Sequence, residues 1–200
     1  MEVINFKKEL RKVKKEVKRN SHFCISDNPA FRYILGSIKD NPLIVMGINP
    51  SIADSNQKDN TTKRVEKIIT NNKFDSYVMF NVCAARQTNL KDFVPNKLDL
   101  EKLHKQNKIA FKWLLHKICK KGKQPIIWAA WGVSLTDYPL LKSMFVSYLK
   151  DIEKISRKYN IKWKTVKTTK FGHPNHPLPL NSNSTLIDFN IDEYINSLNG

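Results

Sequence analysis

Residues 43–54 read LIVMGINPSIAD, an apolar run that passes directly into a glycine, an asparagine and a proline. The continuous apolar character predicts a strand that is buried on both faces, as strands of parallel sheets are. Gly47 permits a close approach of another group, and Pro50 restricts Asn49 to extended conformations, so the amide of Asn49 is held in place. This stretch is therefore either an ordinary turn after a strand or one wall of a pocket.

The rest of the chain alternates strand and helix patterns. Apolar runs predict further buried strands over 76–82, 125–132 and 161–169, and helical spacings of apolar residues predict helices over 59–71, 100–119 and 141–159. The segment FRYILGSI, residues 31–38, predicts a short strand or hairpin. This alternation predicts a single α/β domain with a mainly parallel central four-stranded sheet, flanked by helices on both faces.

The N-terminal segment is expected to form an extra helix. Phe6, Leu10, Val13 and Val17 lie at helical spacing, whereas the other faces are mostly lysine and arginine. We therefore divide the chain into a basic amphipathic helix over 1–22 and an α/β domain over 23–200.

Charge is the most informative bulk property. The 35 Lys and Arg residues exceed the 18 Asp and Glu residues and give a formal net charge of +17. Basic residues concentrate in the first 20 residues and again in 101–124, while 181–200 contain none. Such an excess favours polyanions, so DNA or RNA is the expected partner, and a general lysine bias that serves solubility is the alternative.

Several classes of protein lack their signatures here. The sequence contains no apolar run that could span a bilayer and no signal-peptide pattern, so we expect a cytoplasmic protein without a membrane partner. The scattered cysteines Cys24, Cys83 and Cys119 are expected to be reduced thiols. Phosphate-loop, dinucleotide-binding, serine esterase and metalloprotease motifs are absent, and we expect neither a cofactor nor a metal.

Unusual polar residues follow each of the four predicted core strands. They are Asn49, Asn81, Trp131 with Gly132, and a histidine of the GHPNHPLPL loop, His173 or His176. Ligands of open α/β sheets bind beyond the carboxyl ends of the strands, so these segments are expected to converge on one site.

Each candidate also has a purely structural interpretation. Asn81 lies within an apolar run and must find hydrogen-bond partners or cost about 1–3 kcal/mol, but neighbouring backbone can supply them. Either histidine can hydrogen-bond a base or be structural. The candidate phosphate contacts, which are equally ordinary surface residues, are Arg64, Arg86, His173, Lys105 and Lys112.

The order of the motifs resembles the uracil-DNA glycosylase superfamily. The matching segments are G-I-N-P at 47–50, F-N-V at 80–82, A-W-G at 130–132 and H-P-L-P-L at 176–180. The longer pattern N-P-S-x-A-D, D-x-T-x-x-R and N-x-x-x-x-R also resembles an uncharacterised bacterial family over roughly residues 31–180. The resemblance implies a uracil-DNA glycosylase-like fold and metal-free hydrolysis of the glycosidic bond of a flipped nucleotide.

Residue roles follow from the same resemblance. Asn49 would position the water or sugar, and His176 would stabilise the departing base. Gly47, Asn81 and Trp131 would form the base-binding wall, and Leu180 is the candidate wedge for a duplex. The most active branch of the superfamily has an aspartate where Asn49 stands, and a neutral amide is no general base.

Four functions remain open at this point. The preferred one is a nucleic-acid-binding protein with a nucleobase or nucleotide pocket and weak, altered or lost glycosylase activity. The alternatives are an active DNA glycosylase, a protein that binds or hydrolyses free nucleosides or nucleotides, and a protein-interaction module built on the same fold.

Overall fold

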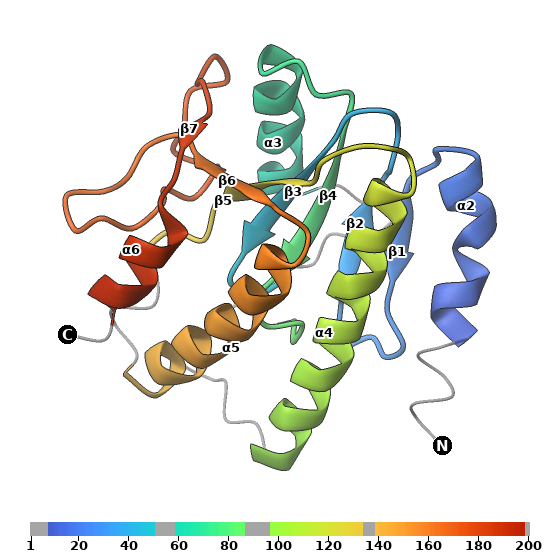
Figure 1. Ribbon diagram of the computed structural model, residues 1–200, viewed down its shortest axis with the longest axis horizontal. Helices are drawn as coiled ribbons and strands as arrows, with labels where there is room; N and C mark the ends of the chain where they lie inside the picture. Colours follow the sequence, from blue (N-terminus) through green and yellow to red (C-terminus); the bar gives the residue numbers. More distant parts are fainter. Residues whose placement is uncertain (1–7, 51–58, 87–96, 134–138, 199–200) are drawn as a thin grey trace.

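The computed structural model describes residues 8–50, 59–86, 97–133 and 139–198. A single sheet has the spatial strand order β1-β2-β4-β3-β5-β6-β7 (Figure 1). Its strands are β1 (Phe23–Ile25), β2 (Ile34–Gly36), β3 (Pro42–Gly47), β4 (Ser76–Asn81), β5 (Ile126–Ala129), β6 (Lys162–Thr165) and β7 (Ile187–Asp188). The helices are α2 (Lys14–Lys18), α3 (Asn60–Asn71), α4 (Lys97–Cys119), α5 (Pro139–Arg157) and α6 (Ile191–Ser197).

The predicted parallel core is present, but the sheet has seven strands rather than four. Strands β4, β3, β5 and β6 are parallel neighbours and correspond to the four predicted strands. Strands β1, β2 and β7 pair antiparallel and extend the sheet at its two edges. The segment 31–38 supplies β2, as expected, whereas β1 and β7 have three and two residues and are too short to show a sequence period.

Helices cover both faces of the sheet, which explains the apolar runs. In β3, Ile44 and Met46 belong to the larger core cluster, which contains residues of α4, α5 and α6. Leu43 and Val45 point the other way and pack in a second cluster with residues of α3. Because successive side chains of a strand alternate between faces, a strand covered on both sides is apolar throughout.

The N-terminal segment packs on the same core. Leu10, Val13 and Val17 are buried in the larger cluster, as their spacing predicts, while Phe6 lies outside the described residues. The charged side chains of α2 therefore occupy its outer faces. Across the described ranges, no helix is both long and apolar enough to cross a membrane.

Candidate nucleobase pocket

A small cavity lies at the carboxyl ends of the central strands. Its volume is about 140 Å³. The lining residues are Arg32, Gly47, Ile48, Asn49, Asp59, Thr61, Thr62, Met79, Asn81, Ala130, Trp131, His176 and Pro177. The structure thus brings together Asn49 after β3, Asn81 at the end of β4 and Trp131 after β5, and adds one histidine, His176, from the loop after β6.

Asn81 and Gly47 form the back of the cavity. They are partners in the parallel register of β3 and β4. The side chain of Asn81 is only 2% exposed, and its Nδ2 is buried with no hydrogen-bond partner among the described residues. A Cβ added to Gly47 would lie 2.7 Å from Asn81 Oδ1, so the glycine makes room for this amide. The end of β4 is held from behind by Asn107, whose Nδ2 donates to the carbonyls of Asn81 (2.9 Å) and Val82 (3.0 Å).

Asn49 lies at the rim of the cavity. It is half-buried, and its Nδ2 makes a long 3.5 Å contact to the carbonyl of Pro50. An amide in this position can donate to or accept from a ligand or a water.

His176 presents a hydrogen-bond donor. Its Nδ1 accepts a hydrogen bond from the backbone N–H of Leu178 at 3.3 Å, so the neutral ring carries its proton on Nε2. Burial lowers the pKa of His176, although the carboxylate of Asp59 opposes this shift. The loop approaches the segment after β5 closely, since a Cβ on Gly132, whose φ is +73°, would lie 3.1 Å from the Cβ of His176.

Trp131 and His173 are joined through Tyr194. The indole Nε1 of Trp131 donates to the Tyr194 hydroxyl at 2.9 Å, and that hydroxyl lies 3.0 Å from His173 Nδ1. His173 is 6% exposed and does not line the cavity. The two histidines of the loop therefore differ: His176 borders the cavity, whereas His173 helps to fix the Trp131 wall.

The charged residues of the cavity are Arg32 and Asp59, which the sequence analysis did not assign to it. Arg32 is 2% exposed, and burial together with nearby Arg86 lowers the pKa of Arg32 to about 10, so it stays charged at neutral pH. Asp59 caps α3, where its Oδ1 accepts from the N–H of Thr62 at 2.8 Å. Asp59 begins the D-x-T-x-x-R pattern, and an aspartate at the start of a helix is ordinarily a cap, whereas the arginine within an apolar strand segment was a usable signal.

The remaining predicted contacts do not line the cavity. Arg64 is half-buried one turn into α3, and Arg86 is close enough to Arg32 to lower its pKa. Lys105 and Lys112 are exposed on α4, which covers the opposite face of the sheet from α3. Leu180, the candidate wedge, is 3% exposed within the α3-side core, so its side chain is not available for insertion into a duplex.

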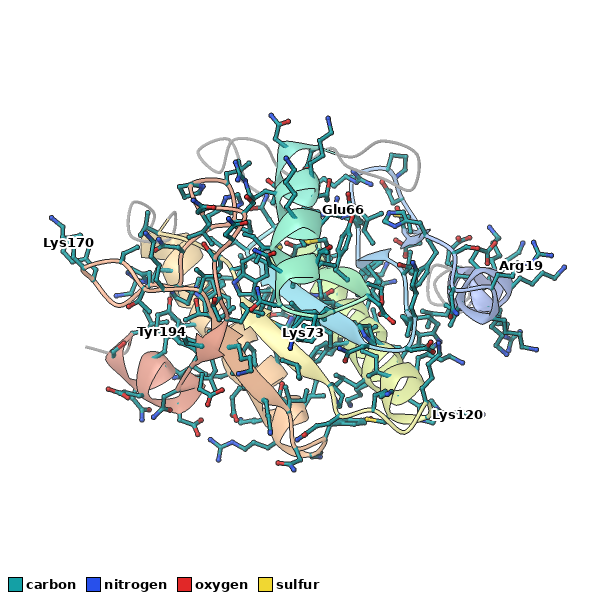
Figure 2. The ribbon with its side chains drawn as sticks, turned by 90° about the horizontal axis from the view of Figure 1, so that it is seen from above. Arg19, Glu66, Lys73, Lys120, Lys170 and Tyr194 are labelled. Carbon is teal, nitrogen blue, oxygen red and sulfur yellow. The ribbon has the colours of Figure 1, made fainter. Side chains whose placement is uncertain are left out.

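Basic residues are spread widely around the molecule. Figure 2 shows Arg19, Lys120 and Lys170 on three separate parts of the surface. The three cysteines are free thiols. Within the described part of the chain, no cluster of three or more His, Cys, Asp or Glu residues is arranged to hold a metal ion.

Comparison with known proteins places the chain in a family. Neither a search of curated proteins nor a search of solved structures finds a match. One family model, described as "Protein of unknown function (DUF1643)", matches residues 32–178, a range that contains every residue lining the cavity. Because that match covers well over half of its length, the chain belongs to the DUF1643 family.

Proposed function

We propose that the cavity binds a single base of a nucleic acid or nucleotide, in a protein with a uracil-DNA glycosylase-like fold. The observation that carries the proposal is the buried, unpartnered Nδ2 of Asn81 in the wall of the cavity. A buried donor without a partner costs about 1–3 kcal/mol, and a ligand oxygen would remove that cost. The motif order at 47–50, 80–82, 130–132 and 176–180 supports the same function.

The volume of the cavity limits the ligand. A cavity of roughly 150 Å³ accommodates benzene in another protein, so about 140 Å³ suits one six-membered ring. A pyrimidine therefore fits better than a purine.

The hydrogen-bonding groups limit the ligand further. Asn81 Nδ2, His176 Nε2 and the Arg32 guanidinium are donors, so the ligand should present oxygen acceptors to them, while the Asp59 carboxylate can accept from an N–H of the ligand. Uracil and thymine carry two ring carbonyls and cytosine carries one. We therefore expect uridine or thymidine to bind more tightly than cytidine.

The test is a thermal-shift series with uridine, thymidine, cytidine, adenosine and guanosine. At a ligand concentration of about 100 Kd, binding stabilises the protein by about 2.7 kcal/mol. For a chain of this size, that corresponds to a rise in Tm of roughly 5–11 °C. Stabilisation by the keto pyrimidines that disappears in Asn81→Leu supports the pocket, and no stabilisation by any nucleoside overturns it.

A second candidate function is hydrolysis of the glycosidic bond, and the position of Asp59 favours it. Asn49 cannot act as a general base, but Asp59 places a carboxylate in the same cavity as His176. In this reaction Asp59 would accept the proton of a water that attacks the sugar carbon, while the Nε2–H of His176 would stabilise the departing base.

Base release separates the two functions. Duplexes and single strands containing uracil or mismatched thymine are incubated with the protein and then cleaved at abasic sites. Cleavage that is lost in both Asp59→Asn and His176→Ala establishes the hydrolase. Binding without cleavage leaves a base-binding protein.

A further inference from the structure

A charged surface groove runs along α3 next to the cavity. Two neighbouring hollows, of about 310 and 640 Å³, share Lys63 and Lys67 as lining residues. We define the α3 groove by its lining residues Asn60, Lys63, Arg64, Glu66, Lys67, Thr70, Leu178, Ser182 and Asn183. It adjoins the cavity, since Thr61 and Pro177 of the cavity wall are chain neighbours of Asn60 and Leu178.

The groove has a fixed second wall. The loop after His176 lies beside α3 (Figure 2). Asn71 Nδ2 donates to the carbonyl of Ser182 at 3.2 Å, and Asn72 Nδ2 donates to the carbonyl of Ser184 at 2.8 Å. Leu180 and Leu186 anchor this loop in the α3-side core. The α3 groove thus lies between α3 and the loop after His176, which are hydrogen-bonded to each other.

The charge of the groove favours an anionic ligand. Lys63 and Lys67 are exposed and lie one helical turn apart, and Arg64 is half-buried beside them. None of these three cations has an ion-pair partner among the described residues. The acid in the groove is Glu66, which accepts a hydrogen bond from the Tyr77 hydroxyl at 3.4 Å.

We propose that the α3 groove binds the sugar-phosphate backbone of a single-stranded nucleic acid whose neighbouring base occupies the cavity. This inference rests on the proposed function. The distance along α3 from Asn60 to Thr70 is about 15 Å, which spans a few nucleotides. A single strand is favoured because its bases are already unpaired, so entry of a base into the cavity does not require a base pair to be broken.

Leu178 fits this ligand. It is 45% exposed at the groove margin, where it offers an apolar surface to the face of a second base. The lysines provide the attraction to phosphate, which depends on salt but not on sequence.

The test compares two double variants by fluorescence anisotropy with a labelled oligothymidylate of about ten nucleotides. Lys63→Ala/Lys67→Ala removes two groove charges. Lys14→Ala/Lys18→Ala removes two exposed charges with the same i,i+4 spacing from α2 and is the matched control. Thymidine binding is measured in parallel by thermal shift.

The groove variant should bind the oligonucleotide several-fold to about tenfold more weakly, and its log–log salt slope should fall by about 1.4, or about 0.7 per phosphate contact. The control should keep the wild-type affinity, and all three proteins should bind thymidine equally. An equal loss of affinity in the control variant would overturn the proposal for the groove. That proposal would also fail if oligothymidylate bound no more tightly than thymidine, although the proposal for the cavity would stand.

Two further outcomes are decisive. If neither thymidine nor the oligonucleotide binds to the wild-type protein, both proposals fail together. If polyglutamate of matched charge displaces the oligonucleotide as effectively as unlabelled oligothymidylate, the groove is a general polyanion or protein surface and the assignment to nucleic acid is wrong.

Discussion

Replacing Asn81 with leucine should leave the ligand-free protein as stable as the wild type or more stable. Asparagine and leucine have the same branched shape, but leucine lacks the buried Nδ2 that has no partner in the described structure. An unsatisfied buried donor costs about 1–3 kcal/mol, so its removal should raise the free energy of unfolding by up to that amount. For a chain of this size, the corresponding rise in Tm is about 2–4 °C per kcal/mol.

Asn107→Leu is the matched control, because the chemical change is identical. The Nδ2 of Asn107 donates to two backbone carbonyls, which the substitution leaves without this donor. The Oδ1 of Asn107 is buried without a partner in the described structure, but the loss of two hydrogen bonds should outweigh the removal of one unpartnered acceptor. The free energy of unfolding should therefore fall by about 1–3 kcal/mol. Urea denaturation measures both variants, provided that the m-value stays constant. A loss of more than about 1 kcal/mol in Asn81→Leu would refute the reasoning, because it would show that the fold already satisfies this amide.

Two other predictions concern the cavity and its supports, and a third concerns a buried histidine of α4. Gly47→Ala places a Cβ 2.7 Å from Asn81 Oδ1. Nucleoside binding should therefore weaken markedly, whereas the free energy of unfolding should fall by only about 1–3 kcal/mol. Unchanged binding would show that Asn81 is not positioned through this contact. Tyr194→Phe removes the hydroxyl that is hydrogen-bonded to both Trp131 and His173. The free energy of unfolding measured by calorimetry should therefore fall by about 1–3 kcal/mol, and an unchanged value would contradict these two buried hydrogen bonds. His104 of α4 is buried, with its Nε2 3.0 Å from a carboxylate oxygen of Asp151. Burial and the charge of Lys108 lower the pKa of His104 against the opposing effect of Asp151, so the unfolded state binds more protons and stability should fall as the pH drops below about 6.5. Denaturation at pH 7.5 and 5.5 should show a smaller loss of stability in His104→Gln than in the wild type, and an equal loss would assign the acid sensitivity to other groups.

The central sheet could be predicted because its strands are buried on both faces. Strands β3 and β4 are apolar at nearly every position, so the single Asn81 stands out against its neighbours. The edge strands could not be predicted, since β7 consists of Ile187 and Asp188, both exposed. Two or three residues carry no readable period.

The candidate site was predicted in part for a similar reason. Residues that directly follow buried strands must lie at one sheet edge, and Asn49, Asn81 and Trp131 do line the cavity. Arg32 lies just before β2 and Asp59 just before α3, and only tertiary packing brings these two residues to the cavity. Histidines three residues apart in one loop cannot be distinguished by sequence, yet His173 turns to Tyr194 whereas His176 borders the cavity.

The most direct measurement is an NMR titration of the side-chain amide of Asn81, assigned by the resonances that disappear in Asn81→Leu. If Asn81 Nδ2 donates to a base oxygen, its proton resonances should move downfield as uridine or thymidine is added and should saturate with the Kd found by thermal shift. Unchanged Asn81 resonances at saturating ligand would contradict a base in this cavity, even if signals elsewhere in the protein moved.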